Sequence, residues 1–304
     1  MKPTNHQYGM AGRKPRGGFT IMELMLAISI TGVIVFALYG MFNHTQKALR
    51  ANIAQVDVLE SGRVTMDLLG REFSEMSATD FEGGTNFLAF PTPVYDPMVQ
   101  ALVGVAAYRT NFLYDCYLFS RQNRDAIGTS YRILFAENGV GTLCRYSTNI
   151  PLISLTRTNL IRLVTTQAPT NYAKMAEGVI HFRLRAYNAD GRLLSYDTTN
   201  GWNTYRLHRE TESGQMLQTT VSSNLVMQGS KLRETRLTFL SNALPAYVEV
   251  ELGVLEPKLV EQLKSFEAGS DLAKSFVSRY SGQVHLFRQR VPIRQSDLSS
   301  TAFR

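Results

Sequence analysis

The 304-residue sequence predicts an α+β fold in which a long N-terminal helix carries a β-rich globular head. Three observations support this prediction. Phe19–Phe42 is apolar throughout, with Glu23 as its only charge. Apolar residues then recur at three- and four-residue spacings as far as Met76, which is the period of a helix. From Ala78 onward this period is replaced by short aromatic and branched segments between Gly, Asn and Pro residues, a pattern typical of strands and turns.

The first 18 residues form a basic leader. They contain Lys2, Arg13, Lys14 and Arg16 and no acidic residue, and they carry four of the 32 basic residues of the chain. The remainder therefore holds 28 basic against 25 acidic residues. So small an excess of positive charge is a weak footprint for nucleic acid, and no nucleic-acid partner is expected.

The apolar segment Phe19–Phe42 is long enough to cross a membrane. As a helix its 24 residues would extend over about 36 Å, and the hydrocarbon core of a bilayer is about 30 Å thick. The apolar region of a cleaved secretory signal has only about 7–15 residues. Because the basic leader precedes the segment, we expect the N-terminus in the cytoplasm and everything beyond Phe42 outside.

Two features go beyond a simple membrane anchor. Gly17 and Gly18 stand directly before Phe19, where the basic leader meets the apolar segment. Glu23 places a carboxylate near the cytoplasmic end of the predicted membrane helix. An ionisable residue in a membrane helix costs about 2–3 kcal/mol at the bilayer centre and less near an interface. We therefore expect Glu23 to serve a function and to have a charged partner.

The segment Gly18–Leu24 (GFTIMEL) resembles the cleavage and methylation motif of type IV pilins and type II secretion pseudopilins. The resemblance implies that a prepilin peptidase in the inner membrane cuts between Gly18 and Phe19 and methylates the new amine of Phe19. It also implies that Glu23 pairs with the N-terminal amine of a neighbouring subunit. A buried ammonium and a buried carboxylate are costly unless they pair, so the implied contact would favour one register between subunits.

Beyond the membrane segment, residues 43–77 predict an amphipathic outer half of the same helix, with one stripe against the head. Within it, Glu60–Phe73 resembles the W-type minor pilins and J-type minor pseudopilins. This resemblance implies a minor subunit that helps to initiate or cap a type IV pilus or a type II secretion pseudopilus. Its partners would be other pilins or pseudopilins, contacted through the N-terminal helix, and its head would lie in the periplasm. The sequence leaves open which of the two systems it serves.

Residues 78–304 are expected to form the β-rich head. Asn188–Gly191 is predicted to be a hairpin turn, Thr198–Ser230 a long loop or insertion, and Lys258–Phe276 to include a helical stretch. The candidate strands are Asn86–Phe90, Leu102–Tyr108, Phe112–Phe119, Tyr131–Ala136, Thr142–Tyr146, Leu160–Thr165, Gly178–Tyr187, Arg236–Leu240, Ala246–Leu255 and Gln283–Arg290.

The two cysteines, Cys116 and Cys144, fall on separate candidate strands. Two cysteines cannot build a cysteine-rich zinc site. In an oxidising compartment they can form a disulfide, and closing this 29-residue loop would stabilise the fold by roughly 3.6 kcal/mol on the chain-entropy estimate. Their pairing is predicted as a possibility that depends on export.

The sequence contains no pattern of catalytic, metal-ligating or cofactor-binding residues. The histidines are scattered and include no zinc-protease pair, and neither a phosphate-binding glycine loop nor a nucleophile-elbow serine is present. We therefore expect no enzyme activity, metal or cofactor. The histidines are His6, His44, His181, His208 and His285.

Three alternatives to a minor filament subunit remain open at this point. The head could bind a ligand, as an adhesin or DNA-uptake pilin does, or the chain could be a signal-anchored periplasmic domain, or a membrane-tethered enzyme. A ligand-binding head would need an exposed basic or aromatic patch. The candidate basic residues are Arg183, Arg185, Arg206, Arg209, Lys231, Arg233 and Arg236.

Overall fold

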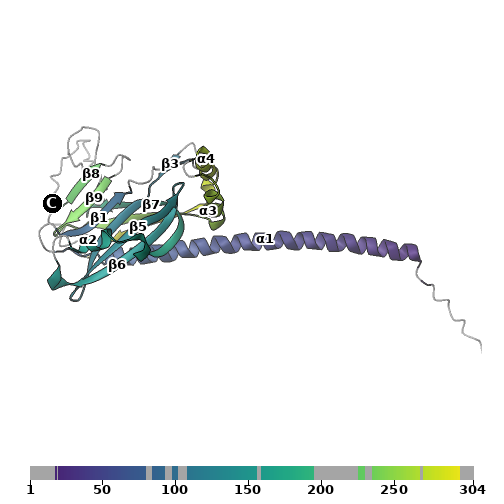
Figure 1. Cartoon of the computed structure of the whole chain (residues 1–304), viewed down its shortest axis with the longest axis horizontal. Helices are drawn as coiled ribbons and strands as arrows, with labels where there is room; N and C mark the ends of the chain where they lie inside the picture. Colours follow the sequence, from purple (N-terminus) through teal and green to yellow (C-terminus); the bar gives the residue numbers. More distant parts are fainter. Residues whose placement is uncertain are drawn as a thin grey trace, which may run out of the picture. The chain divides into compact units, whose positions relative to one another are not determined.

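The computed structural model confirms the predicted α+β fold, in which a long helix is followed by a β-rich head (Figure 1). It describes residues 18, 20–79, 84–92, 98–101, 108–155, 159–194, 225–229, 235–267 and 270–294. The chain divides into two compact units, Met1–Ile53 and Ala54–Arg304. Helix α1 (Ile21–Ser74) runs through the boundary between them without a break, close to the predicted limits Phe19 and Met76.

In the first unit, every side chain of α1 from Ile21 to Phe42 is exposed. Two hydroxyl groups in this part turn back onto the helix: Ser29 and Thr31 donate to the carbonyls of Met25 and Ala27, each at 2.8 Å. The segment thus satisfies its own backbone and these two hydroxyl groups, as a helix in hydrocarbon must. By length and composition it is apolar enough to cross a membrane.

The second unit is built on an antiparallel sheet of nine strands in the part of the chain that the structure describes. Their order is β11-β10-β7-β6-β5-β4-β1-β9-β8, and β2 and β3 form a separate ribbon. The strands are β1 (Thr85–Pro91), β2 (Met98–Ala101), β3 (Tyr108–Asn111), β4 (Tyr114–Gln122), β5 (Asp125–Glu137), β6 (Val140–Pro151), β7 (Ala173–Tyr187), β8 (Leu225–Gly229), β9 (Thr235–Leu240), β10 (Tyr247–Leu255) and β11 (Val284–Pro292).

The outer half of α1 packs on one face of this sheet. Gly62 shows how closely the two approach, because a Cβ added there would lie 2.2 Å from the ring of Phe287 on β11. The ring of Phe73 meets that of Phe87 on β1 edge to face, with centroids 5.8 Å apart. The buried apolar helix residues are Val58, Met66, Leu69 and Phe73, spaced three, four or eight residues apart on one helix face.

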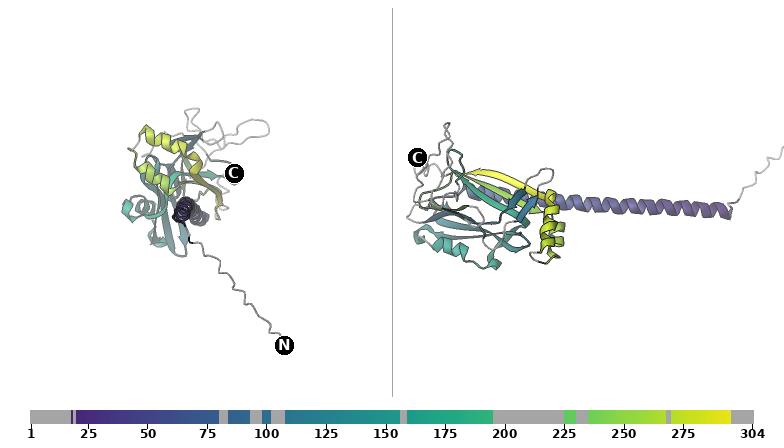
Figure 2. Two further views of the ribbon diagram at one scale, coloured as in Figure 1. Left: turned by 90° about the vertical axis from the view of Figure 1, so that its right-hand side faces the viewer. Right: turned by 90° about the horizontal axis from the view of Figure 1, so that it is seen from above.

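The opposite face of the sheet is covered by short helices: α2 (Asn159–Thr165) over β4 to β6, and α3 (Pro257–Lys264) with α4 (Asp271–Arg279). Figure 2 shows α3 and α4 side by side at one end of the sheet. The prediction that Leu160–Thr165 is a strand is wrong. A short apolar run has no clear period, and here Leu160 and Val164, one helical turn apart, are both buried against Gly128 of β5.

The other predicted elements of the head mostly hold. Nine of the ten candidate strands lie wholly within described residues, and all of these except Leu160–Thr165 contain strands. Of Leu102–Tyr108 only Tyr108 is described, as the start of β3. Two strands were not predicted: β2, and β8 inside the expected loop Thr198–Ser230. The turn at Asn188–Gly191 is confirmed, with Gly191 at φ 76°. The helical stretch after β10 is two helices, because Ser270 caps a new one by accepting the amide of Ala273 at 3.2 Å.

Candidate processing and assembly site

The described part of the cleavage motif begins at Gly18. This residue is exposed, and a Cβ built on it would meet no heavy atom within 4 Å. Phe19, the other side of the predicted cleavage bond, lies outside the described residues, as do Arg13, Lys14 and Arg16 of the leader. Gly18 therefore stands in open surroundings, as a peptide bond that a peptidase must reach requires.

Thr20 and Glu23 form a reciprocal cap at the start of α1. The Thr20 hydroxyl accepts the backbone N–H of Glu23 at 3.2 Å, and Oε2 of Glu23 accepts the backbone N–H of Thr20 at 3.0 Å. The Thr20 hydroxyl also lies 3.0 Å from the same carboxylate oxygen as a donor. This is a capping box, which a Thr-x-x-Glu sequence directly before an apolar run produces. The motif that resembles a processing signal therefore also defines where the helix begins.

The geometry leaves the Glu23 carboxylate able to bind a further donor. Both donors from Thr20 reach Oε2. A carboxylate offers about four acceptor positions on its two oxygens, so capacity for an ammonium group remains. The sequence singled out Glu23, and Thr20 was missed as its partner, although the Thr-x-x-Glu spacing was a sufficient signal.

A second polar contact, which we call the helix clamp, joins the outer half of α1 to the sheet. It consists of Glu72 on α1, Tyr131 on β5 and Arg145 on β6. Arg145 Nη2 lies 2.6 Å from Glu72 Oε1, and its Nε lies 3.0 and 3.2 Å from the two carboxylate oxygens. Tyr131 donates its hydroxyl to the same carboxylate. Burial raises the pKa of Tyr131, and the charge of Glu72 raises it further, so the phenol remains a donor. The sequence carried no signal for this contact.

The disulfide that the sequence left open is not formed in this structure, where both cysteines are free and buried. Cys116 on β4 lies opposite Tyr131 of β5, whereas Cys144 on β6 lies opposite Arg132. Since Tyr131 and Arg132 are consecutive residues of one strand, the two thiols point to opposite faces of the sheet. Two strand spacings also separate them by about 9.5 Å, beyond the roughly 7 Å that a disulfide tolerates between Cα atoms. Burial raises the pKa of both thiols, which keeps them protonated.

The predicted basic patch is not assembled as one surface. Arg183 and Arg185 lie together on β7. Arg236 lies on β9, which four strands separate from β7, and it stacks over the ring of Phe90 at 5.0 Å. The remaining candidates lie outside the described residues: Arg206, Arg209, Lys231 and Arg233.

The two histidines of the head that the structure describes have structural partners. His181 is buried, accepts the backbone N–H of Phe112 through Nδ1 at 3.2 Å, and holds Glu251 through Nε2 at 3.3 Å. His285 lies 3.6 Å from Glu256. Within the described ranges, no three His, Cys, Asp or Glu side chains gather into a group that could hold a metal ion.

Comparison with known proteins agrees with the geometry at the start of α1. Residues 13–39 match the prokaryotic N-terminal methylation motif, which supports the type IV pilin and pseudopilin family. Such a motif implies processing by a prepilin peptidase, assembly with other pilins and a membrane-embedded N-terminal helix. The apolar half of α1 fits membrane anchoring of this kind. No curated protein matches the chain, and no solved structure does so either.

Proposed function

We propose that the chain is a minor pilin or pseudopilin, a structural subunit that helps to initiate or cap a type IV pilus or a type II secretion pseudopilus. Residues 1–18 are its leader, 19–42 its membrane segment, 43–77 its outer helix and 78–304 its periplasmic head. The observation that carries the proposal is the methylation motif at residues 13–39, placed so that its Glu23 lies in the first turn of an exposed apolar helix.

In this proposal a prepilin peptidase cuts between Gly18 and Phe19, and the new N-terminus of Phe19 is methylated. The ammonium formed there is a partner for the Glu23 carboxylate of a neighbouring subunit. Neither charge can remain alone in a filament core without water, because an unpaired buried charge costs several kcal/mol. Thr20 holds the Glu23 carboxylate at the helix start before a neighbouring subunit arrives.

Two observations favour a minor, tip-located role over a main shaft subunit. The head is large, comprising residues 78–304, and bulky heads pack poorly at every step of a narrow filament. The segment Glu60–Phe73 resembles minor subunits. Counting subunits in isolated filaments tests this part of the proposal, because abundant incorporation along the shaft would contradict it.

The cleavage step is tested by intact mass and N-terminal sequencing of the membrane-extracted chain, expressed with and without a prepilin peptidase. We expect a chain that begins at an N-methylated Phe19 only when the peptidase is active. A chain that retains its leader beside an active peptidase would leave only a signal-anchored protein. Gly17→Ala serves as a matched control for Gly18→Ala, and only the second substitution is expected to block cleavage.

The assembly step is tested with Glu23→Gln, which keeps the size of the side chain and removes its charge. We expect the variant to be cleaved normally and to be lost from isolated filaments, because its amide cannot neutralise an ammonium. Immunoblots of the membrane and filament fractions measure both outcomes. Normal incorporation of Glu23→Gln would disprove the proposed pairing.

A further inference from the structure

Strand β11 ends the nine-stranded sheet. It pairs with β10 along all nine of its residues, Val284 to Pro292, and no described strand pairs with its other side. An edge strand of this length presents a row of unpaired backbone N–H and C=O groups that can accept another strand. Its alternate side chains face opposite ways: Phe287 and Gln289 lie against α1, and Arg288 and Arg290 lie on the outer face.

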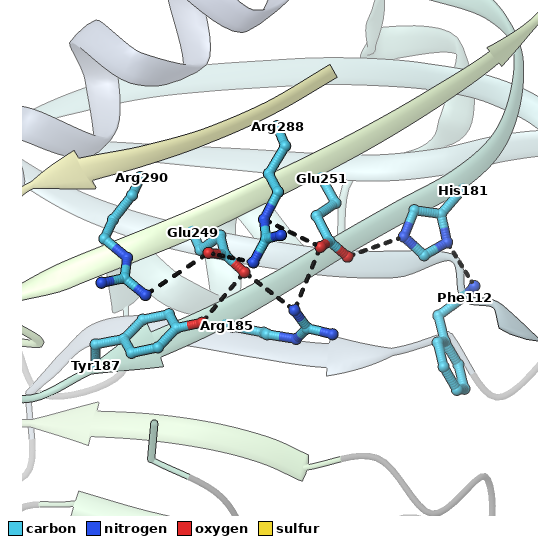
Figure 3. Close-up of polar contacts among 8 residues, drawn as sticks. All are labelled: Phe112, His181, Arg185, Tyr187, Glu249, Glu251, Arg288 and Arg290. Carbon is cyan, nitrogen blue, oxygen red and sulfur yellow. Dashed lines mark hydrogen bonds and ion pairs between the residues drawn. The ribbon is translucent and has the colours of Figure 1, made fainter. Parts of the chain in front are cut away.

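The outer face of β7, β10 and β11 carries four arginines around two glutamates. We call it the arginine face and define it by Arg183, Arg185, Arg288 and Arg290. In the strand register, Glu249 of β10 lies between Arg185 and Arg290, and Glu251 lies between Arg183 and Arg288. Two rows of the form Arg-Glu-Arg thus cross the three strands side by side. Figure 3 shows Arg185, Glu249 and Arg290 of the first row and Glu251 and Arg288 of the second.

The contacts fix the guanidinium groups in place. Arg185 Nη1 lies 3.0 Å from Glu249 Oε1 and 3.3 Å from Glu251 Oε1. Arg288 Nη2 lies 2.9 Å from Glu249 Oε2, and its Nε lies 3.4 Å from Glu251 Oε1. Arg290 stacks on the ring of Tyr187, 3.9 Å from its centroid. These side chains are therefore ordered before any ligand arrives, which lowers the entropy cost of binding.

Both glutamates are ionised at neutral pH. A hydrogen bond with His181 lowers the pKa of Glu251 to about 2, and the charge of Arg185 adds to this effect. Burial acts to raise the pKa of Glu249, but hydrogen bonds from Arg288 and Arg185 outweigh burial and hold it below the ordinary value. Four positive charges thus stand against two negative ones, and the excess is at the surface. The Arg288 and Arg290 side chains are 55% and 44% exposed, whereas those of Glu249 and Glu251 are 4% and 12% exposed.

We propose that the open edge of β11 accepts an extended acidic segment of a different polypeptide as a tenth strand. Backbone hydrogen bonds to β11 would hold the segment, and its carboxylates would pair with Arg288 and Arg290. These two side chains are two residues apart on one strand, about 6.7 Å, which is the spacing of same-face side chains on any strand. The open edge and the two arginines together favour a segment in which every second residue is acidic, because alternate side chains of a strand face the same way.

The arginines argue against a second copy of this chain as the occupant. Two β11 strands paired antiparallel in full overlap would place Arg288 of one copy opposite Arg288 of the other, with Arg290 of each copy diagonal to it. Like charges directly opposite each other destabilise a strand pair. A nucleic acid fits less well than an acidic strand, because it binds through many phosphates at once and the arginine face has an excess of only two charges, interleaved with carboxylates.

The test uses the full chain in detergent micelles and two fluorescent nine-residue peptides, in which valine alternates with glutamate or with lysine. Fluorescence anisotropy is expected to show binding of the glutamate peptide, weakened by added salt, and no binding of the lysine peptide. Arg288→Gln with Arg290→Gln should weaken binding about twofold to thirtyfold, since each of the two cross-strand ion pairs contributes about 0.2–1 kcal/mol. The control, Arg162→Gln with Lys258→Gln, removes two exposed charges elsewhere and should leave binding unchanged.

Hydrogen exchange on the wild-type chain tests the backbone part of the proposal without any substitution, and so remains informative if the arginine variant does not fold. Addition of the glutamate peptide should slow the exchange of backbone amides of β11 between Val284 and Val291. Absence of binding, equal binding of both peptides, or binding without protection of β11 would each overturn the proposal. So would a 20-base-pair DNA duplex that binds in the same arginine-dependent way while the glutamate peptide does not.

Discussion

The two halves of α1 are one continuous helix in two different environments. From Ile21 to Phe42 every side chain is exposed, whereas between Val58 and Phe73 one side of the helix is buried in the head. The first half has an apolar surface on all sides, and the second half has one apolar stripe. A helix that is apolar on all sides needs lipid or other proteins around it, whereas a striped helix needs only one partner surface.

The comparison shows that the two halves are stabilised independently. Burial of Phe73 and its neighbours contributes to the free energy of unfolding of the head. The exposed apolar residues of the first half contribute nothing to that free energy within a single chain. Substitutions in the two halves are therefore expected to have different readouts, stability for one and membrane insertion or assembly for the other.

The largest difference is expected between two phenylalanines. Phe73→Ala should destabilise the head by about 3–5 kcal/mol, because Phe73 is fully buried and packs against Phe87. Phe36→Ala, at a side chain that is 80% exposed, should leave the stability of the head unchanged. Both free energies of unfolding can be measured by urea denaturation of the full chain in micelles, followed by the far-ultraviolet circular dichroism of the β-sheet. Equal losses would show that the two halves unfold as one unit.

A smaller effect is expected from the helix clamp. Glu72→Gln should destabilise the head by about 2 kcal/mol, because Arg145 and Tyr131 lose a charged acceptor in a mostly buried contact. The control is Glu177→Gln, which breaks the exposed pair with Lys174 and should cost less than about 0.5 kcal/mol. The same unfolding assay compares the two variants. A Glu72→Gln loss no larger than that of the control would show that the clamp is not stabilising.

A further effect is expected from acid, and it should arise in the head. The pKa of Glu251 is about 2 in the folded chain, below the ordinary value of 4.5. A lowered folded-state pKa contributes stability above about pH 4.5, and this stability is lost as the pH falls toward 2. Unfolding should therefore become easier between pH 4.5 and 2, and Glu251→Gln should reduce this dependence. An unchanged pH profile in that variant would assign the acid sensitivity to other carboxylates.

Much of the local structure could be predicted from the sequence because its causes are local. The helix follows from apolar spacing, and the turn at Gly191 from a residue that tolerates a positive φ. Leu160–Thr165 was misread because a six-residue apolar run fits a strand as well as a helix. Contact with β5 decides between them, and that contact is not visible in the run itself.

The polar contacts of the head likewise combine features that are visible in the sequence with features that only the tertiary structure shows. Glu249 and Glu251 alternate on β10, and Arg288 and Arg290 alternate on β11, so each strand could be recognised separately. The sequence does not show that β7, β10 and β11 are neighbours in the sheet, and the arginine face forms only because they are. The sequence left the disulfide open for the same reason, since only the sheet order shows that β5 separates the strands of the two cysteines.

The sequence by itself determined the apolar half of the helix, the methylation motif and the helix start at Thr20 and Glu23, because each depends on residues within a short stretch of the chain. Only the tertiary structure decided the helix clamp, the separation of Cys116 from Cys144 and the open edge at β11. These features join residues that are distant in the chain. Their geometry follows from strand order and register, which the packing of the whole head selects.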